Sequence, residues 1–308
     1  MAFSVVINQV LLLFAFLAVG FAVGKSGKIT QAGTKDITWL LMYVINPCVI
    51  FTSMQMNYSP VLADGLLIAA VSAVGVHFFS IALARLIFGK RVPEGYRAIL
   101  RYAVTYSNCG FMGLPLLKVL VGSSGVFYGT AYLAVFNLFI WTHGVLIFQS
   151  GQASKENRRL VLKALINPNV CAIAVGILFF FCSVQLPAQI FTPLNDIALV
   201  NAPLSLIAIG VMISQRNLSG IWREKYLWPV VALRNLLIPL AAVAALRLLG
   251  LHGAMLYACL IQVACPIAGN TALFAEMFGK DTVLPSKLIA VSTLLSIITI
   301  PFVLWAAG

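Results

Sequence analysis

Long apolar runs without charged residues restrict how this chain can fold more than any other feature. The runs from Val5 to Val23 and from Gly65 to Ala84 contain no Asp, Glu, Lys or Arg. Each is long enough to cross a hydrocarbon core of roughly 30 Å as a helix. The chain of 308 residues is 61% hydrophobic and 9% charged, too apolar for a soluble domain whose surface faces water. The sequence therefore predicts an all-α integral membrane protein and argues against a soluble enzyme.

The succession of apolar runs predicts about ten membrane-crossing helices in one membrane domain. A span with its short connection takes roughly 30 residues, which leaves little chain for a separate soluble module. The first run lacks a preceding basic stretch and a small-residue cleavage site, so we expect a retained helix rather than a signal peptide. The predicted spans are residues 4–24, 35–55, 63–88, 96–121, 125–148, 165–184, 190–214, 226–249, 254–278 and 284–306.

The net charge of +12 is concentrated in alternate connections between these spans. Lys and Arg are retained on the cytoplasmic side of a membrane, so the asymmetry predicts that both termini lie outside. Nucleic-acid-binding proteins gather basic residues on one face of a folded domain, so we expect membrane lipid and no nucleic acid as a partner. One set of alternate connections has only two basic residues near it, Lys118 and Arg247. The other set is rich in basic residues and holds Lys25, Lys28, Lys35, Arg85, Lys90, Arg91, Arg97, Arg101, Lys155, Arg158, Arg159, Lys163, Arg216, Arg223, Lys225, Lys280 and Lys287.

The longest polar stretch, Gln149 to Lys163, has five predicted spans before it and five after it. An odd number of spans in each half makes the second half enter the membrane in the opposite orientation, an arrangement common in transporters. We therefore expect residues 1–148 to form one five-helix repeat, 149–164 a cytoplasmic linker, and 165–308 an inverted repeat.

The fourth and ninth predicted spans carry Gly, Pro and Asn in their middle. Aligned without a gap, they end on Gly122 and Gly279. Proline removes an amide donor and glycine eases departure from helical geometry, so both spans are predicted to break. A matching pair of broken spans is typical of a transport site, and the freed N–H groups favour an anion; the alternative is an ordinary kink in each helix. The candidate residues are Asn108, Gly110, Gly113 and Pro115 in one span and Pro266, Gly269, Asn270 and Thr271 in the other.

The stretch NCGFMGLP, from Asn108 to Pro115, resembles the Asn-x-x-x-x-Gly-x-Pro pattern of the auxin efflux carrier family. That family includes the plant PIN carriers and bacterial malonate and malate permeases. The stretch from Cys265 to Gly279 looks like the partner motif in the ninth helix, and residues 137–144, NLFIWTHG, are also of the family's type. In the order of spans, the resemblance covers essentially the whole chain.

The resemblance implies a five-plus-five inverted repeat whose fourth and ninth helices cross beside a carboxylate-binding site. It implies that Asn108 contacts the substrate carboxylate, that Asn270 lies opposite, and that Pro115 and Pro266 mark the two breaks. A transport domain would move against a smaller scaffold domain as an elevator, and a homodimer through the scaffold helices is expected. The long hydrophilic loop of the large plant members is missing.

Ionisable groups inside the spans are candidates for coupling, because such groups are costly in lipid. His77 and His143 could carry a proton at neutral pH, with a hydrogen-bonded structural role as the alternative for each. Asp64 begins the third span, but Ile68 stands where the resemblance to plant carriers implies a lysine that pairs with the acid. The sequence therefore lacks the charged pair on which such coupling would depend.

Other polar residues in the spans receive supporting roles. Arg234 could counter an anionic substrate, but we expect its side chain to extend towards the cytoplasmic interface. Glu276 and Lys280 are spaced for an ion pair on one helix. Residues expected to line the site from other spans are Asn46, Asn137, Asn201 and Gln262; the Asn46–Pro47 pair and the segment 201–203, Asn-Ala-Pro, are either hinges or packing kinks.

The six cysteines show no metal-site spacing and lie within apolar runs. We therefore expect them to pack as small hydrophobic side chains, with no disulfide, metal or cofactor. A phosphate-binding loop motif is also missing from the sequence, which argues against an ATP-driven pump.

These features predict a secondary transporter of a small organic anion in a bacterial inner membrane. The substrate would be a mono- or dicarboxylate, either auxin-like or malonate- and malate-like. Two alternatives are a sodium-coupled carrier of the bile-acid type and a membrane sensor that binds the ligand without moving it. An intramembrane enzyme lacks support, because no nucleophile–base pair or metal cluster is visible.

Overall fold

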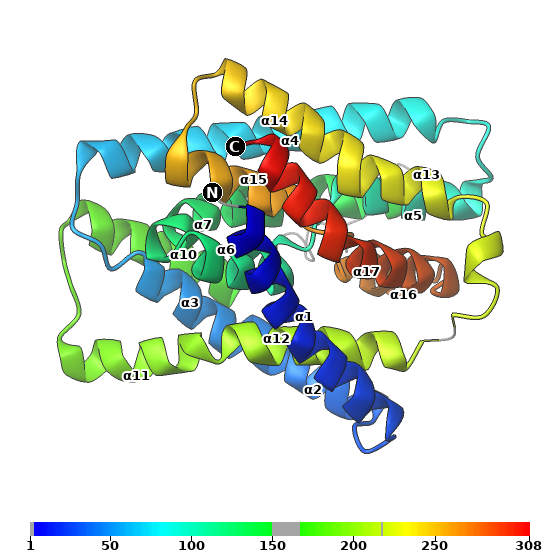
Figure 1. Cartoon of the computed structure of the whole chain (residues 1–308), viewed down its shortest axis with the longest axis horizontal. Coiled ribbons are helices and arrows are strands. Elements are labelled where there is room, and N and C mark those ends of the chain that lie inside the picture. The colour runs from blue at the N-terminus through cyan, green and yellow to red at the C-terminus, as the bar shows by residue number, and fades with distance from the viewer. Residues whose placement is uncertain (1–2, 150–166, 217) are drawn as a thin grey trace.

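The computed structural model describes residues 3–149, 167–216 and 218–308 as a bundle of helices (Figure 1). Within those ranges the only strand-like feature is one isolated antiparallel bridge, between Ser107 and Ile267. The prediction of an all-α integral membrane protein is confirmed. In the same ranges, seven helical stretches are long and apolar enough to cross a membrane: Val6–Lys25, Gln31–Ser53, Pro60–Ile87, Ser123–Phe148, Ala188–Ser214, Leu227–Leu248 and Val283–Ala306.

Residues 3–149 form four long helical stretches and one broken helix. Two of the three π-helical turns within these residues interrupt a stretch without ending it, and the third opens the second half of the broken helix. The elements are α1 (Phe3–Lys25), α2 (Gln31–Leu40), η1 (Leu41–Ile45), α3 (Asn46–Ser53), α4 (Pro60–Ile87), α5 (Glu94–Thr105), η2 (Cys109–Gly113), α6 (Leu114–Leu120), α7 (Ser123–Phe139), η3 (Ile140–Gly144) and α8 (Val145–Phe148).

The second half contains a second broken helix in the corresponding place. Three predicted spans, 96–121, 165–184 and 254–278, match the shorter apolar helices Cys109–Leu120, Pro168–Phe181 and Gly253–Ala264. The predicted linker, apart from Gln149, lies outside the described residues. The elements are α10 (Pro168–Phe181), α11 (Ala188–Leu199), α12 (Asn201–Ser214), the 3-10 turn η4 (Ile221–Arg223), α13 (Leu227–Ala232), η5 (Leu233–Leu237), α14 (Ile238–Leu248), α15 (Gly253–Ala264), α16 (Asn270–Met277) and α17 (Val283–Ala306).

Local sequence signals set several helix starts. Thr30 caps α2 by accepting a hydrogen bond from the N–H of Gly33, and Ser59 caps α4 ahead of Pro60. Asn167 caps α10 in the same way. A side-chain oxygen at this position satisfies one of the backbone donors that a helix start leaves free, which fixes where these helices begin.

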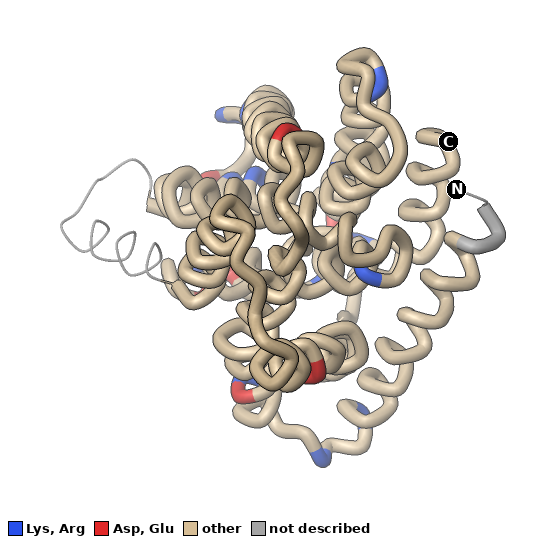
Figure 2. The backbone as a smooth tube through the Cα atoms, turned by 90° about the vertical axis from the view of Figure 1, so that its left-hand side faces the viewer, with Lys and Arg blue, Asp and Glu red and all other residues tan. Residues whose placement is uncertain are grey.

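Basic residues separate between the two ends of the bundle. The connections α4–α5, α12–α13 and α16–α17 lie towards the right of Figure 1 and α1–α2 lies at the lower right, and each contains Lys or Arg. The connections α3–α4, α10–α11 and α14–α15 lie towards the left and contain neither residue. Figure 2 looks onto that left-hand side and shows few basic residues there. The alternation in the sequence is thus a separation in space.

The outside of the bundle is apolar, as a surface facing lipid requires. Large side chains such as Val61, Leu86 and Leu248 are at least 76% exposed. The cysteine prediction holds in part: Cys109, Cys259 and Cys265 are buried and all six are free, but Cys171 and Cys182 are exposed on this surface. Apolar runs do not distinguish a lipid-facing position from a buried one, which is why those two were misplaced.

Helices α1 and α12 cross at a seam of small residues. A Cβ atom at Gly20 would stand 2.1 Å from the carbonyl oxygen of Ile207, and one at Gly210 would stand 2.1 Å from the carbonyl oxygen of Leu17. Gly24 faces Ser214 in the same seam. Small residues four apart let helix backbones approach closely, and van der Waals packing is a main source of helix association in lipid.

We expect Gly20→Leu to destabilise the protein by about 1–3 kcal/mol or more, because the added side chain must push two backbones apart. Thermal unfolding in detergent, followed by tryptophan fluorescence, measures the change. Gly75→Leu is the matched control, since the space around Gly75 is open on the exposed face of α4. Equal unfolding midpoints for the two variants would contradict a close α1–α12 contact.

Candidate functional site

Two interrupted helices meet at the centre of the bundle. Helices α5 and α15 each run for 12 residues and stop. In Figure 1, α5 and α16 lie towards the right and α6 and α15 towards the left, so the two broken helices enter from opposite ends. Their extended breaks pair as the Ser107–Ile267 bridge. The N–H of Asn108 donates to the carbonyl of Pro266 at 2.7 Å, and the N–H of Ala268 donates to the carbonyl of Tyr106 at 3.0 Å.

The two prolines have different places in these breaks. Pro266 lies in the non-helical segment between α15 and α16, as expected. The prediction for Pro115 was wrong, because the first break lies at residues 106–108 and Pro115 is the second residue of α6. Pro115 follows the π-helical turn η2 within one continuous helical stretch, so the irregularity next to this residue without an N–H is a π-helical turn rather than the extended break.

Both broken helices end at glycine, as their alignment suggested. Gly122 follows α6 with φ +82° and Gly279 follows α16 with φ +62°. At the second site the N–H of Lys280 donates to the carbonyl of Ala275, which satisfies a carbonyl at the helix end. A positive φ there favours glycine, so both half-helices are followed by a glycine for the same conformational reason.

Two polar side chains from other helices support the bridge. The N–H of Ile267 donates to the hydroxyl of Ser292 on α17 at 2.9 Å. That hydroxyl donates to Asn235 Oδ1 at 2.6 Å, and Asn235 Nδ2 donates to the Ser292 carbonyl at 2.8 Å. Both side chains are buried, so the break in α15 is tied to two other helices.

Arg234 lies beside the crossing, and the expectation that it extends to the interface was wrong. Its side chain is the largest of the fully buried ones and is 0% exposed. It donates to the carbonyls of Val104, Thr105 and Val263, which are among the last carbonyls of α5 and α15. Helix ends leave such carbonyls unpaired, and their attraction for a cation holds the guanidinium inside the bundle.

A cavity of about 40 Å³ lies beside the crossing, and Arg234 is not in its lining. It brings together six of the residues predicted from the sequence: Asn46, Asn108, Gly110, Asn137, Gly269 and Asn270. Its lining does not include six other predicted residues: Gly113, Pro115, Pro266, Thr271, Asn201 and Gln262. The remaining lining residues were missed by the sequence analysis and are Met42, Ser107, Phe111, Leu133, Phe136, Asn169 and Ala268.

Unpaired amide groups surround this cavity. Within the described residues, the side chains of Asn108 and Asn270 make no hydrogen bond, and the N–H groups of Gly110 and Gly269 have no acceptor. Gly110 is in the first turn of η2, and Gly269 is the residue before α16. The positive ends of two half-helices and two free amide side chains therefore face the cavity.

The chain matches a family of membrane proteins along almost its whole length. The model of the family described as "Membrane transport protein" matches residues 5–304. The chain belongs to this membrane transport family. This is the auxin efflux carrier family, so the resemblance noted in the sequence is confirmed.

Two relatives support the assignment. One is named "Uncharacterized transporter", comes from Methanothermobacter thermautotrophicus, and is 25% identical over 97% of both chains. The other is named "Putative malonate transporter", comes from Rhizobium meliloti, and is 22% identical over 76% of this chain and 75% of its own. Family and relatives together make this chain a multi-pass membrane transport protein rather than an enzyme.

The residues around the cavity show how this family member packs its crossing. Asn137 Nδ2 donates to the Leu133 carbonyl at 2.9 Å, and Asn46 Oδ1 accepts from Asn201 at 2.5 Å. Gly113 has a packing role, because a Cβ atom there would stand 1.9 Å from Gln262 Oε1. Pro115 is buried in α6, and Thr271 donates to the Ala268 carbonyl within the second break.

Asn169 is a polar lining residue that the sequence analysis did not predict. It is buried at the start of α10, and its Nδ2 donates to the carbonyl of Met42 at 3.2 Å. Its Oδ1 has no partner among the described residues. The Asn-Pro-Asn segment at residues 167–169 is typical of a helix start, and only its packing against η1 brings it to the cavity.

The three candidates for coupling lie in different surroundings. His143 Nδ1 is 2.9 Å from the hydroxyl of Tyr106, which lies in the first break and also donates to the Phe139 carbonyl. His77 is buried on α4, bonded to the Ala73 carbonyl at 2.7 Å and stacked on Phe139. Asp64 is exposed and does not line the cavity. Of these three, only His143 is joined to a break by a side-chain hydrogen bond.

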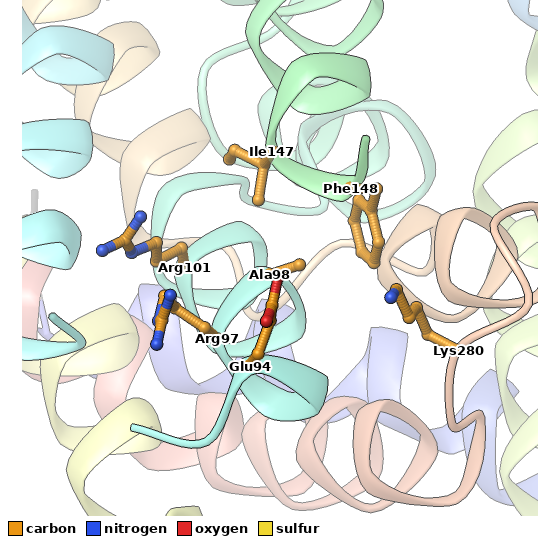
Figure 3. A pocket seen from close by; sticks show the side chains of 7 residues that line it. All are labelled: Glu94, Arg97, Ala98, Arg101, Ile147, Phe148 and Lys280. Atoms are coloured by element: carbon orange, nitrogen blue, oxygen red, sulfur yellow. The ribbon is translucent and has the colours of Figure 1, made fainter. Parts of the chain in front are cut away.

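A second pocket of about 200 Å³ lies between α5, α8 and the end of α16. In Figure 3, Arg97 and Arg101 lie on one side of it and Phe148 and Lys280 on the other.

The predicted pair of Glu276 with Lys280 was wrong. Helix α16 ends at Met277, so helical spacing does not extend to Lys280, and Glu276 lies 4.0 Å from Lys35 instead.

We expect Ser292→Ala to lower the free energy of unfolding by about 1–3 kcal/mol, because it leaves the buried N–H of Ile267 without an acceptor. The matched control is Ser296→Ala, one turn along α17, where the equally buried hydroxyl donates to the Thr293 carbonyl of its own helix and lies 4.0 Å from the sulfur of Met112, a weak acceptor. A smaller loss, below about 1 kcal/mol, is expected there. Unfolding in detergent compares the two, and equal losses would contradict the supporting role of Ser292.

Proposed function

We propose that this protein is a secondary transporter that carries a small organic anion, a mono- or dicarboxylate, through the cavity at the crossing. One observation carries the proposal: the N-terminal ends of two half-helices and the side chains of Asn108 and Asn270 face one cavity. Helix N-termini present N–H groups and a partial positive charge, and a carboxylate accepts several hydrogen bonds at once. Interrupted helices of this kind form the substrate sites of many transporters.

The lining is suited to releasing its ligand as well as to binding it. Among the described residues, neither Lys nor Arg lines the cavity, so the anion would be held by dipoles and neutral amides. A fixed cation in a dry site would bind a carboxylate much more strongly, and a carrier must let its substrate go. Phe111 and Phe136 give the cavity an apolar wall that suits the carbon skeleton of the anion.

The arrangement of the chain supports an elevator mechanism. We propose a five-plus-five inverted repeat, residues 1–148 and 165–308, with about ten crossings and both termini outside. Support comes from the broken helices entering from opposite ends and from the gathering of basic connections at one end of the bundle. The glycine seam between α1 and α12 suits a rigid scaffold against which the crossing moves. A homodimer through this scaffold, in a bacterial inner membrane, completes the proposal.

Malonate is the first substrate to test, because a relative carries that name and because a dicarboxylate can use both half-helix ends. Purified protein in liposomes loaded with unlabelled anion should take up labelled malonate, malate, another small carboxylate or indole-3-acetate by counterflow. We expect Asn108→Ala to raise the concentration for half-maximal exchange about tenfold or more, the cost of a lost hydrogen bond to a charged group.

Asn195→Ala on α11 is the matched control, since it removes the same group outside the cavity and should leave counterflow unchanged. Counterflow that Asn108→Ala leaves intact would keep the transporter and discard its proposed site. Binding without flux for every anion, in folded and correctly inserted protein, would favour the sensor instead.

We assign proton coupling to His143 rather than to His77 or Asp64. Its Nε2 atom is buried and has no partner among the described residues, while its Nδ1 atom reaches the first break through Tyr106. A proton gained or lost at this ring therefore changes a hydrogen bond to a side chain whose backbone takes part in the crossing. His77 has no such connection, and its bond to Ala73 stays within α4.

If the carrier is proton-coupled, its transport rate should vary with pH, and His143→Gln should flatten that dependence because glutamine does not titrate between pH 5 and 8. His77→Gln should keep the wild-type profile. Uptake into liposomes at a series of external pH values measures both. A flattened profile for His77→Gln with an unchanged one for His143→Gln would reverse the assignment.

A further inference from the structure

The guanidinium of Arg234 lies where the C-terminal ends of two half-helices meet. Its Nη1 atom donates to the carbonyls of Val104 and Thr105 at 3.2 Å each, and its Nη2 atom donates to that of Val263. Helix C-termini carry a partial negative charge on carbonyls that have no partner within the helix. One cation thus serves the ends of α5 and α15 at the same time.

Arg234 has no acidic partner in the part of the chain that the structure describes. The two ion pairs found there are Lys35–Glu276 and Lys287–Glu224, both away from the crossing. Burying a charge is costly unless it is paired and hydrogen-bonded, so the carbonyls must supply the compensation. Arg234 Nε has no protein partner among the described residues, so Nη1 and Nη2 make the hydrogen bonds to the carbonyls.

The local backbone explains how Arg234 reaches this position. It lies in the π-helical turn η5, and its neighbour Asn235 holds the break in α15 through Ser292. Two consecutive residues therefore serve one crossing, Arg234 at the carbonyl ends and Asn235 behind the bridge. Single π-helical turns are frequent at functional sites, where they re-aim side chains.

Carbonyls at half-helix ends are the groups that bind a mobile coupling cation in transporters with interrupted helices. Here the guanidinium already occupies the three carbonyls. We propose that Arg234 is a tethered counter-cation that takes the place of a mobile metal ion at the crossing, so that the crossing needs no Na⁺ to assemble. The consequence for coupling, that substrate exchange is independent of Na⁺, rests on the proposed transport function, whereas the structural role does not.

The test compares thermal unfolding of purified protein in detergent with Na⁺ and with choline at equal ionic strength. Wild type should have the same midpoint in both. Arg234→Ala should unfold at least about 5 °C lower, as expected when buried carbonyls lose their partner in a chain of this size. Low millimolar guanidinium should recover part of that loss. Arg247→Ala, which removes an exposed arginine bonded to the Ala307 carbonyl, should respond to no added cation.

A second pair of variants covers the case in which Arg234→Ala does not fold. Arg234→Lys keeps the charge and Arg234→Gln keeps a hydrogen-bond donor without the charge, so the lysine variant should be recovered in larger amount and unfold at the higher temperature. Equal behaviour of the two would overturn the counter-cation role. A wild-type midpoint that rises in Na⁺ but not in choline would overturn it as well.

Counterflow then separates this proposal from the transport function. Exchange of labelled malonate at the same rate in Na⁺ and in choline is the expected result, and Na⁺-dependent exchange would overturn the proposal while leaving the transporter intact. If no anion is exchanged at all, the transport function fails, and the unfolding measurements still decide the role of Arg234.

Discussion

The backbone bridge between the two interrupted helices is the contact on which the rest of the interior depends. Breaking two helices inside a membrane frees backbone groups that lipid cannot satisfy. Three sets of partners satisfy many of them. The breaks pair with each other around Ser107 and Ile267, Ser292 takes the N–H of Ile267, and Arg234 takes three carbonyls. The amides of Gly110 and Gly269 face the cavity, where they are available to a ligand.

The negative and positive ends of the helix dipoles at the crossing therefore have different partners. Two C-terminal ends bind Arg234, and two N-terminal ends line a cavity that Arg234 does not reach. The fixed cation and the proposed anion would therefore not compete for the same backbone groups. The neutral lining near Asn108 and Asn270 fits a carrier, because binding through dipoles and amides is weak enough to reverse.

The frame around the crossing has a different physical basis. Helices α1 and α12 approach through Gly20, Gly24 and Gly210, where contact is made by backbone rather than by polar groups. In lipid such a seam depends on close packing, since burial of apolar surface brings little advantage there. Hydrogen bonds and charge stabilise the crossing, whereas close packing stabilises the seam. This difference suits the proposed mechanism, in which the crossing moves and the α1–α12 seam stays in place.

The sequence alone determined the membrane environment, most span positions, the paired breaks and their glycine ends, because hydropathy and backbone propensity are local properties. It also named six residues that share the cavity, since polar asparagine is costly within an apolar span and glycine weakens the helix there. Tertiary structure decided which carbonyls Arg234 binds, why Pro115 is not the break, and that Ser292 and Asn169 belong to the crossing. These outcomes join residues from distant parts of the chain, and only packing brings them together. A local sequence pattern does not indicate which distant residues will be in contact in the folded chain.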